Sequence, residues 1–130
     1  MAAHDPALLN AFFDRFCAAF ATFDASPVAD LFSTPSVARR MDGSILGLPT
    51  RDDVRHYYQA ALDSYHRKDC RSCRWKDLQA TSMGRRSVVA AVSWELLDQD
   101  SAVVQGWRQS YNLGETDQGL KVFASAMHVE

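Results

Sequence analysis

The spacing of apolar residues changes once along the chain, near residue 70, and this change is the strongest constraint on the fold. Before it, apolar residues recur every three or four positions, which indicates amphipathic helices. After it, apolar and polar residues mostly alternate, which indicates strands. All four prolines lie within the first 49 residues, and all six glycines lie from Gly43 onward. The sequence therefore predicts an α+β domain whose long strands occupy the C-terminal part.

Two helices are predicted first, over residues 6–23 and 27–32. Each begins with a proline that follows a capping residue, Asp5 for the first helix and Ser26 for the second, a combination typical of helix starts. The first helix is apolar around most of its circumference. A helix of this kind needs a broad covering surface, such as a curved sheet.

A short hairpin and a third helix are predicted next. Two brief strands, 36–41 and 44–48, flank the Asp42-Gly43 pair, which is a strong local turn signal. Thr50, with a carboxylate three residues later, is placed to cap a helix over residues 51–66.

Four long strands complete the predicted order, over residues 70–83, 86–97, 102–113 and 120–129. The whole order is α-α-β-β-α-β-β-β-β. We therefore expect a single domain over residues 1–130, in which three helices pack on the concave face of a strongly curved antiparallel sheet.

Composition excludes several classes of function. The chain has 130 residues, 14 of them basic and 16 acidic, so its formal charge is −2. A general nucleic-acid binder or a polybasic membrane surface needs a large positive excess, and neither kind of partner is expected. The N-terminus lacks the basic and continuous apolar regions of a signal peptide. An odd number of cysteines, three, favours reduced thiols and a cytoplasmic location.

No metal or cofactor is expected. His66, Cys70 and Cys73 are the best ligand set in the sequence, but a structural zinc site needs four ligands. Nucleotide-binding glycine loops and the nucleophile motif of hydrolases do not occur either. His128 could form an acid–base pair with Glu95, Asp98 or Asp100, although the spacing does not select among them.

The order of elements resembles the nuclear transport factor 2-like superfamily, whose members share a cone-shaped, cystatin-like α+β fold. The similarity covers nearly the whole chain and depends on the order and spacing of its motifs. The segments that carry it are residues 24–32, the Asp42-Gly43 turn with Gly47, and residues 51–58, 106–111 and 121–128.

The resemblance implies a fold more than a function, because the superfamily includes SnoaL-like cyclases, steroid-isomerase-like enzymes, epoxide hydrolases, dehydratases, ligand binders and protein-binding members. The isomerase-like branch uses a tyrosine on the first helix, an acid on the third long strand and a carboxylate base near the first short strand. Phe16, Gln109 and either Arg39 or Arg40 stand at these positions. Phenylalanine cannot donate a hydrogen bond and arginine cannot take a proton, so we expect no activity of that kind, although the Gln109 amide could still donate.

The cone implied by the resemblance is expected to hold a pocket between the helices and the sheet. The candidate pocket residues are Phe16, Tyr57, Tyr58, Trp94, Trp107, Gln109, Tyr111 and Arg39. Apolar walls with a few polar groups suit a small apolar or aromatic ligand. The predicted function is that of a small SnoaL-like protein that binds such a ligand and lacks the acid–base groups of the isomerases. In the alternative, these aromatic side chains fill the cone as core, and the chain is a non-enzymatic, homodimeric partner-binding or structural module.

Two further expectations concern the strands. Of the neighbouring Arg39 and Arg40, only one can face the pocket, where it could bind a carboxylate or a phosphate. The alternative is a solvated arginine pair, or an ion pair with Asp30 or Asp42. The outer face of the sheet is predicted to carry small apolar residues, which would be buried in a homodimer. These are Val89, Ala91, Leu97, Val122, Ala124 and Ala126.

Overall fold

Capping side chains fix the starts of the three helices in the computed structural model, which describes residues 3–129. Helix α1 spans Pro6–Phe20, and the Asp5 carboxylate accepts a hydrogen bond from the Ala7 amide at 2.8 Å. Helix α3 spans Arg51–Arg67 and begins with the predicted capping box of Thr50 and Asp53.

The ends of the first two helices differ from the prediction. Helix α1 ends at Phe20 rather than at Phe23, whose positive φ of 54° is incompatible with a continuing right-handed helix. Helix α2 spans Ala25–Ala29 and not residues 27–32, because its cap is Asp24, which accepts a hydrogen bond from the Ser26 amide at 2.9 Å. The sequence offers two capping residues in this loop, and the first of them is used.

Six strands form one sheet in the order β2-β1-β6-β5-β4-β3. Their bounds are β1 Phe32–Arg39, β2 Ile45–Leu48, β3 Ser72–Ser82, β4 Ser87–Leu97, β5 Val103–Thr116 and β6 Gly119–Met127. Neighbouring strands are antiparallel except β1 and β6, which are parallel. The prediction of a wholly antiparallel sheet is wrong at this pair. It joins the first strand to the last, and local patterns do not specify so distant a pairing.

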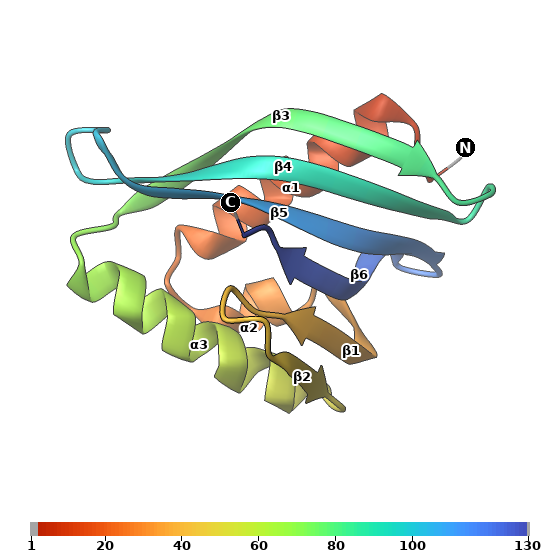
Figure 1. Ribbon diagram of the computed structural model, residues 1–130, viewed down its shortest axis with the longest axis horizontal. Helices are drawn as coiled ribbons and strands as arrows, with labels where there is room; N and C mark the ends of the chain where they lie inside the picture. The colour runs from red at the N-terminus through yellow and green to blue at the C-terminus, as the bar shows by residue number, and fades with distance from the viewer. Residues whose placement is uncertain (1–2, 130) are drawn as a thin grey trace.

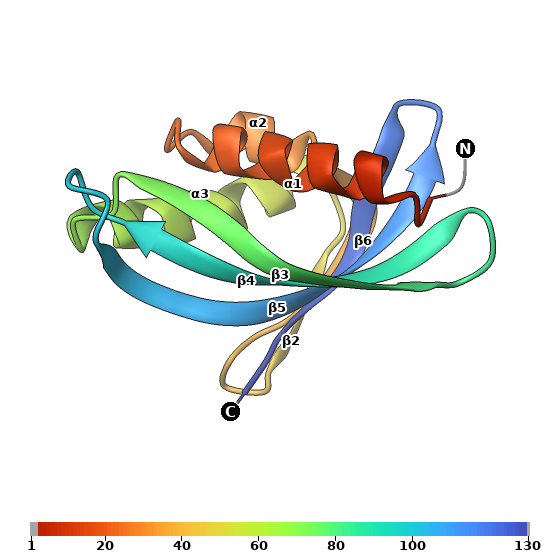
Figure 2. The same cartoon turned by 90° about the horizontal axis from the view of Figure 1, so that it is seen from above.

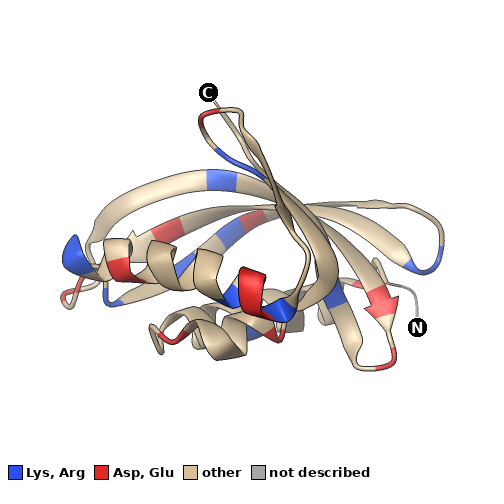
Figure 3. Ribbon diagram, turned by 90° about the horizontal axis from the view of Figure 1, so that it is seen from below, with Lys and Arg blue, Asp and Glu red and all other residues tan. Residues whose placement is uncertain are grey.

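The sheet is strongly curved, and all three helices lie on its concave side (Figures 1 and 2). In Figure 2 the β1–β2 hairpin and the end of β6 extend to the opposite side of the sheet. This arrangement confirms the predicted α+β fold with helices against a curved sheet. Within residues 3–129, no helix is long and apolar enough to cross a membrane. Basic and acidic residues are interspersed along the ribbon (Figure 3), as the small net charge suggests.

Phenylalanines of α1 form the centre of the core. Phe12 and Phe13 are completely buried, and the Phe13 ring lies within about 6 Å of the rings of Trp94 and Tyr111. Inward residues alternate strictly along β4, from Val88 to Leu96. The broad apolar surface of α1 is therefore covered by the concave face of the sheet, as the sequence of the helix predicts.

The predicted outer face needs two corrections. Val122 is buried in the core, and Leu97 is also buried. Each residue borders a bulge. The bulge beside Val122 lies between the pairs Leu113–Val122 and Asn112–Ala124, and the bulge beside Leu97 lies where Leu96 and Leu97 pair with β5. In β6 the extra residue is Phe123, and it shifts the alternation of faces so that Val122 and Ala124 no longer point the same way. At Leu97 the extra residue is Val104 of β5, so the alternation of β4 is unchanged and Leu97 is buried at the end of its strand.

Candidate functional site

A cavity of about 50 Å³ lies between the helices and the concave face of the sheet. We call it the inner cavity. Every predicted pocket residue except Arg39 lines it. The lining residues that were predicted are Phe16, Tyr57, Tyr58, Trp94, Trp107, Gln109 and Tyr111. These side chains come from α1, α3, β4 and β5, which converge only in the folded chain.

Arg39 does not reach the inner cavity. It is exposed on β1, where its register partner is Ala126 on β6. Ala38 is buried, and because side chains alternate along a strand, its neighbours Val37 and Arg39 point outward. Arg40 turns to the hairpin instead, where its Nε donates to the Ser44 hydroxyl at 2.9 Å. Both arginines are therefore exposed, and neither lines the inner cavity.

The cavity is also lined by residues that were not predicted as pocket residues. These are Phe20, Ala61, Leu62, Tyr65, Leu96 and Met127. Tyr65 could have been found, because it follows Tyr58 and Leu62 on the same face of α3 at helical spacing. Met127 could also have been found, because it follows Ala126, which was predicted to face outward, and neighbouring side chains of a strand point to opposite faces.

Two tryptophan indoles orient the polar groups of the inner cavity. Trp107 Nε1 donates to Gln109 Oε1 at 2.8 Å, and Trp94 Nε1 donates to the Tyr111 hydroxyl oxygen at 2.8 Å. Gln109 and Tyr111 are both buried on the inner face of β5. The rigid rings of the wall therefore hold the two central polar side chains in defined directions.

The tyrosines of the inner cavity keep their protons. Burial raises the pKa of Tyr65 to about 12 and raises the pKa of Tyr57 as well. Burial also raises the pKa values of Tyr58 and Tyr111 well above the usual 10. Of the residues described, none with a carboxylate or an imidazole lines this cavity. The arrangement therefore offers hydrogen bonds and apolar surface and does not offer a general base.

Stacked rings form the edge of the inner cavity. Tyr65 stacks on Trp107 with ring centroids 5.6 Å apart and on Phe20 with centroids 5.8 Å apart. Tyr65 and Trp107 are only partly buried, whereas Phe16 and Trp94 on the inner side are buried.

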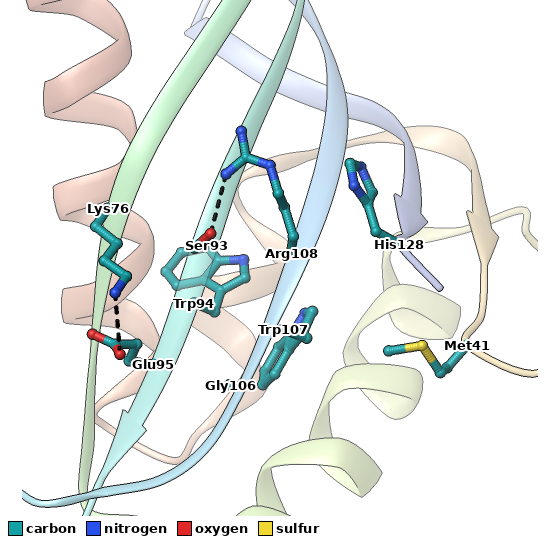
Figure 4. Close-up of a pocket in the computed structure, with 9 residues that line it drawn as sticks. All are labelled: Met41, Lys76, Ser93, Trp94, Glu95, Gly106, Trp107, Arg108 and His128. Atoms are coloured by element: carbon teal, nitrogen blue, oxygen red, sulfur yellow. Dashed lines mark hydrogen bonds and ion pairs between the residues drawn. The ribbon is translucent and has the colours of Figure 1, made fainter. Parts of the chain in front are cut away.

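A larger hollow, of about 390 Å³, lies on the convex side of the sheet, and we call it the outer groove (Figure 4). Its residues are Met41, Lys76, Ser93, Trp94, Glu95, Gly106, Trp107, Arg108 and His128. Its one carboxylate, Glu95, is paired with basic side chains. Glu95 accepts from Arg74 at 2.8 Å and lies 3.5 Å from the Lys76 ammonium. The hydrogen bond from Arg74 lowers the pKa of the Glu95 carboxyl.

Arg108 and His128 are also engaged at the outer groove. Arg108 donates to the Ser93 hydroxyl at 3.1 Å and to the Asp77 carbonyl at 3.0 Å. The His128 imidazole Nε2 lies 2.6 Å from the Ser110 hydroxyl oxygen, and its partner is neither Glu95 nor an aspartate. Among residues 3–129 no carboxylate hydrogen-bonds this imidazole, so the pair lacks the third group of a catalytic triad. The same part of the chain contains no cluster of three His, Cys, Asp or Glu side chains able to hold a metal.

Comparisons with known proteins agree with this architecture. Aln2 from a Streptomyces species superposes with a TM-score of 0.78 at 12% identity, over 96% of this chain and 92% of Aln2. A cystatin-like protein of unknown function from Nostoc punctiforme gives 0.76 at 9% identity, over 97% and 91% of the two chains. An NTF2-like protein from Cytophaga hutchinsonii gives 0.69 at 15% identity, over 95% and 97%.

At these low identities, the structural similarities show the fold alone. No curated protein matches the sequence. A family of NTF2-like proteins, designated DUF6841, matches residues 5–130. This match spans every helix and strand of residues 3–129 and confirms the resemblance drawn from the order of elements. The chain belongs to this NTF2-like family, DUF6841.

Proposed function

We propose that the chain binds a small, flat, apolar or aromatic molecule in the inner cavity, without the acid–base chemistry of steroid isomerases. The observation that carries the proposal is a cavity walled by aromatic rings with two oriented polar side chains, Gln109 and Tyr111, at its centre. Small-molecule sites combine these features. The free thiols of the three cysteines support a reducing compartment, the cytoplasm, as the place of this function.

A ligand would have to enlarge the cavity. An apolar cavity that holds benzene has a volume of about 150 Å³, whereas the inner cavity has about 50 Å³. The side chain best placed to move is Tyr65, which is only partly buried, and within residues 3–129 its hydroxyl has no hydrogen-bond partner. Trp107 is anchored by its bond to Gln109. We therefore propose that the ligand ring displaces Tyr65 and stacks on Trp107.

The test compares two tryptophans, with 1-indanone as the probe. Trp107→Ala removes a wall of the inner cavity and should raise the dissociation constant about tenfold. Trp75→Ala is the matched control, because Trp75 is also partly buried but is bonded to Asp14 Oδ1 at 2.9 Å and does not line the cavity. Binding is measured by ligand-observed NMR and stability by the melting temperature. Equal losses of affinity in both variants, or none in Trp107→Ala, would contradict the proposal.

A second candidate, the homodimeric module with a filled core, is favoured by the outer face of the sheet. Three large apolar side chains are exposed there, Val37 at 44%, Ile45 at 67% and Phe123 at 38%. They surround small residues such as Ala124 and Ala126, whose side chains allow a close approach of two sheets. Arg39 also points outward, beside Ile45 and Ala126, but most of the side chains on this face are small or apolar. We propose a second copy of this chain as the occupant, because a two-fold dimer buries the same patch of both copies.

The dimer has its own test. Sedimentation equilibrium at micromolar concentration should give twice the 14.5 kDa mass of the chain. Ala124→Arg places a charge in the middle of the outer face and should shift the protein to the monomer. Ala60→Arg, at an exposed position of α3, is the control and should remain dimeric. A single 14.5 kDa species in the unmodified protein would exclude the dimer.

A further inference from the structure

We propose that Cys17 of α1 and Cys73 of β3 form a reversible disulfide within one chain when the protein meets hydrogen peroxide. The inference goes beyond the proposed function, because it assigns a covalent modification site whose two cysteines do not line the inner cavity. All three cysteines carry free thiols in the structure. Disulfides that form only on oxidation are the kind that reducing compartments allow.

The packing of α1 on the concave side of β3 brings the two cysteines together (Figure 2). One turn before Cys17, Phe13 and Asp14 both contact Trp75. The rings of Phe13 and Trp75 lie 5.9 Å apart between centroids, and Trp75 Nε1 donates to Asp14 Oδ1 at 2.9 Å. Cys73 lies two residues before Trp75 on β3, so the two side chains point to the same face.

The two elements advance by similar distances from these contacts. One turn of helix rises about 5 Å, and two residues of a strand cover about 7 Å. Cys17 therefore lies beside Cys73, as Asp14 lies beside Trp75. The residues between and after the inward pair on β3, Arg74 and Lys76, are exposed and bind Glu95 on the other face of the sheet.

The two thiols are in direct contact and differ in character. The Cys73 thiol donates a hydrogen bond to the Cys17 sulfur, and this bond lowers the pKa of Cys17 against the opposing effects of burial and of the Asp14 carboxylate. The same bond, together with burial, raises the pKa of Cys73. Cys17 is therefore the thiolate of the pair and attacks the oxidant, and Cys73 is the second thiol, which closes the disulfide.

Exposure separates this pair from the third cysteine. Cys17 and Cys73 are only partly buried, so a molecule as small as hydrogen peroxide can reach them. Cys70 is completely buried, and its thiol donates to the Ser72 carbonyl at 3.4 Å. Burial also raises the pKa of Cys70. Cys70 lacks both the exposure and the thiolate character of a reactive cysteine, and it serves as the control.

Hydrogen peroxide supplies the oxidising equivalents. The Cys17 thiolate attacks one peroxide oxygen, the O–O bond breaks, and the leaving hydroxide takes up a proton to become water, so Cys17 becomes a sulfenic acid. The Cys73 sulfur then attacks the Cys17 sulfur. The S–S bond forms, the S–O bond breaks, and the hydroxyl group leaves with the Cys73 proton as a second water. Two thiols are thereby oxidised to one disulfide, and one peroxide is reduced to two waters.

The disulfide would join the first helix to the edge of the sheet, because β3 is the last strand in the order and pairs with β4. A covalent link between residues 17 and 73 closes a long loop and restricts the unfolded chain. We expect the melting temperature of the oxidised protein to lie about 5–15 °C above that of the reduced protein. Dithiothreitol should return it to the reduced value.

The experiment treats the unmodified protein with a small excess of hydrogen peroxide near neutral pH. The intact mass should fall by about 2 Da, and titration of the denatured chain should find one thiol in place of three. Digestion without reductant should release a peptide pair that joins Cys17 to Cys73. Cys70→Ala should form the same link at the same rate. Cys17→Ser should form none, and in Cys73→Ser the Cys17 sulfenic acid should persist and react with dimedone.

The peptide map of the unmodified protein decides the matter even if the serine variants fail to fold. A link that includes Cys70, a link between two chains, or oxidation of the thiols without any link would overturn the inference. A lower melting temperature after oxidation would overturn it too, because the bond would then form only in a distorted chain. None of these results depends on a ligand in the inner cavity, so the proposed function is tested separately.

Discussion

Replacing Phe13 by alanine should lower the free energy of unfolding by about 3–5 kcal/mol. Phe13 is completely buried and contacts the rings of Phe12, Trp75, Trp94 and Tyr111, with centroids 5.3–6.1 Å apart. Removing its ring would leave a void, because the neighbouring rings are fixed by hydrogen bonds and cannot collapse into it. Urea unfolding followed by circular dichroism gives the free energy directly.

The same substitution on the convex side of the sheet is the control. Phe123 is 38% exposed, so Phe123→Ala should cost about 1 kcal/mol or less when measured at a concentration low enough to keep the chain monomeric. Similar costs at the two positions would mean that Phe13 does not lie at the centre of the core.

The fold could be predicted from the sequence wherever a local pattern determined the structure. The capping box at Thr50 and the Asp42-Gly43 turn are interactions between near neighbours in the chain, and both occur where predicted. Pairing of distant segments is different. The parallel contact of β1 with β6 depends on the packing of the whole domain, and the prediction of an antiparallel sheet failed there.

Bulges set a second limit. Alternation predicts one common direction for Val122, Ala124 and Ala126, but the pairing skips a residue between Val122 and Ala124. Val122 therefore points into the core, whereas Ala124 and Ala126 lie on the outer face. A shift of one residue reverses every side chain beyond it, and the sequence around Phe123 carries no glycine or proline that would have signalled it.

The candidate site shows the same division. Its aromatic residues could be predicted, because large side chains alternate along β5 and recur on one face of α3. The direction of Gln109 could not, since it depends on a hydrogen bond with the neighbouring Trp107 ring. The size of the inner cavity also required the folded structure, because it is the small space left after all the rings have packed.

The stability of the protein should fall steeply above pH 10. Burial raises the pKa of Tyr65 to about 12 and that of Tyr58 and Tyr111 well above 10, whereas tyrosines in the unfolded chain ionise near pH 10. A raised pKa in the folded state stabilises the fold below the unfolded value, and this contribution is lost as the pH rises toward the folded one. Above pH 10, each such tyrosine lowers the free energy of unfolding by about 1.4 kcal/mol per pH unit, and the three together lower it by about 4 kcal/mol per pH unit.

Urea midpoints from pH 8 to 11.5 measure this loss, and phenolate absorbance at 295 nm reports ionisation directly. The raised pKa values of Cys70 and Cys73 add a loss that begins near pH 9, so the tyrosine contribution is isolated with Tyr65→Phe. That variant should reduce the slope above pH 10 by about 1.4 kcal/mol per pH unit. If all four tyrosines ionised near pH 10 while the protein stayed folded, the hydroxyls of the inner cavity would be open to solvent, and the expected steep loss of stability would not occur.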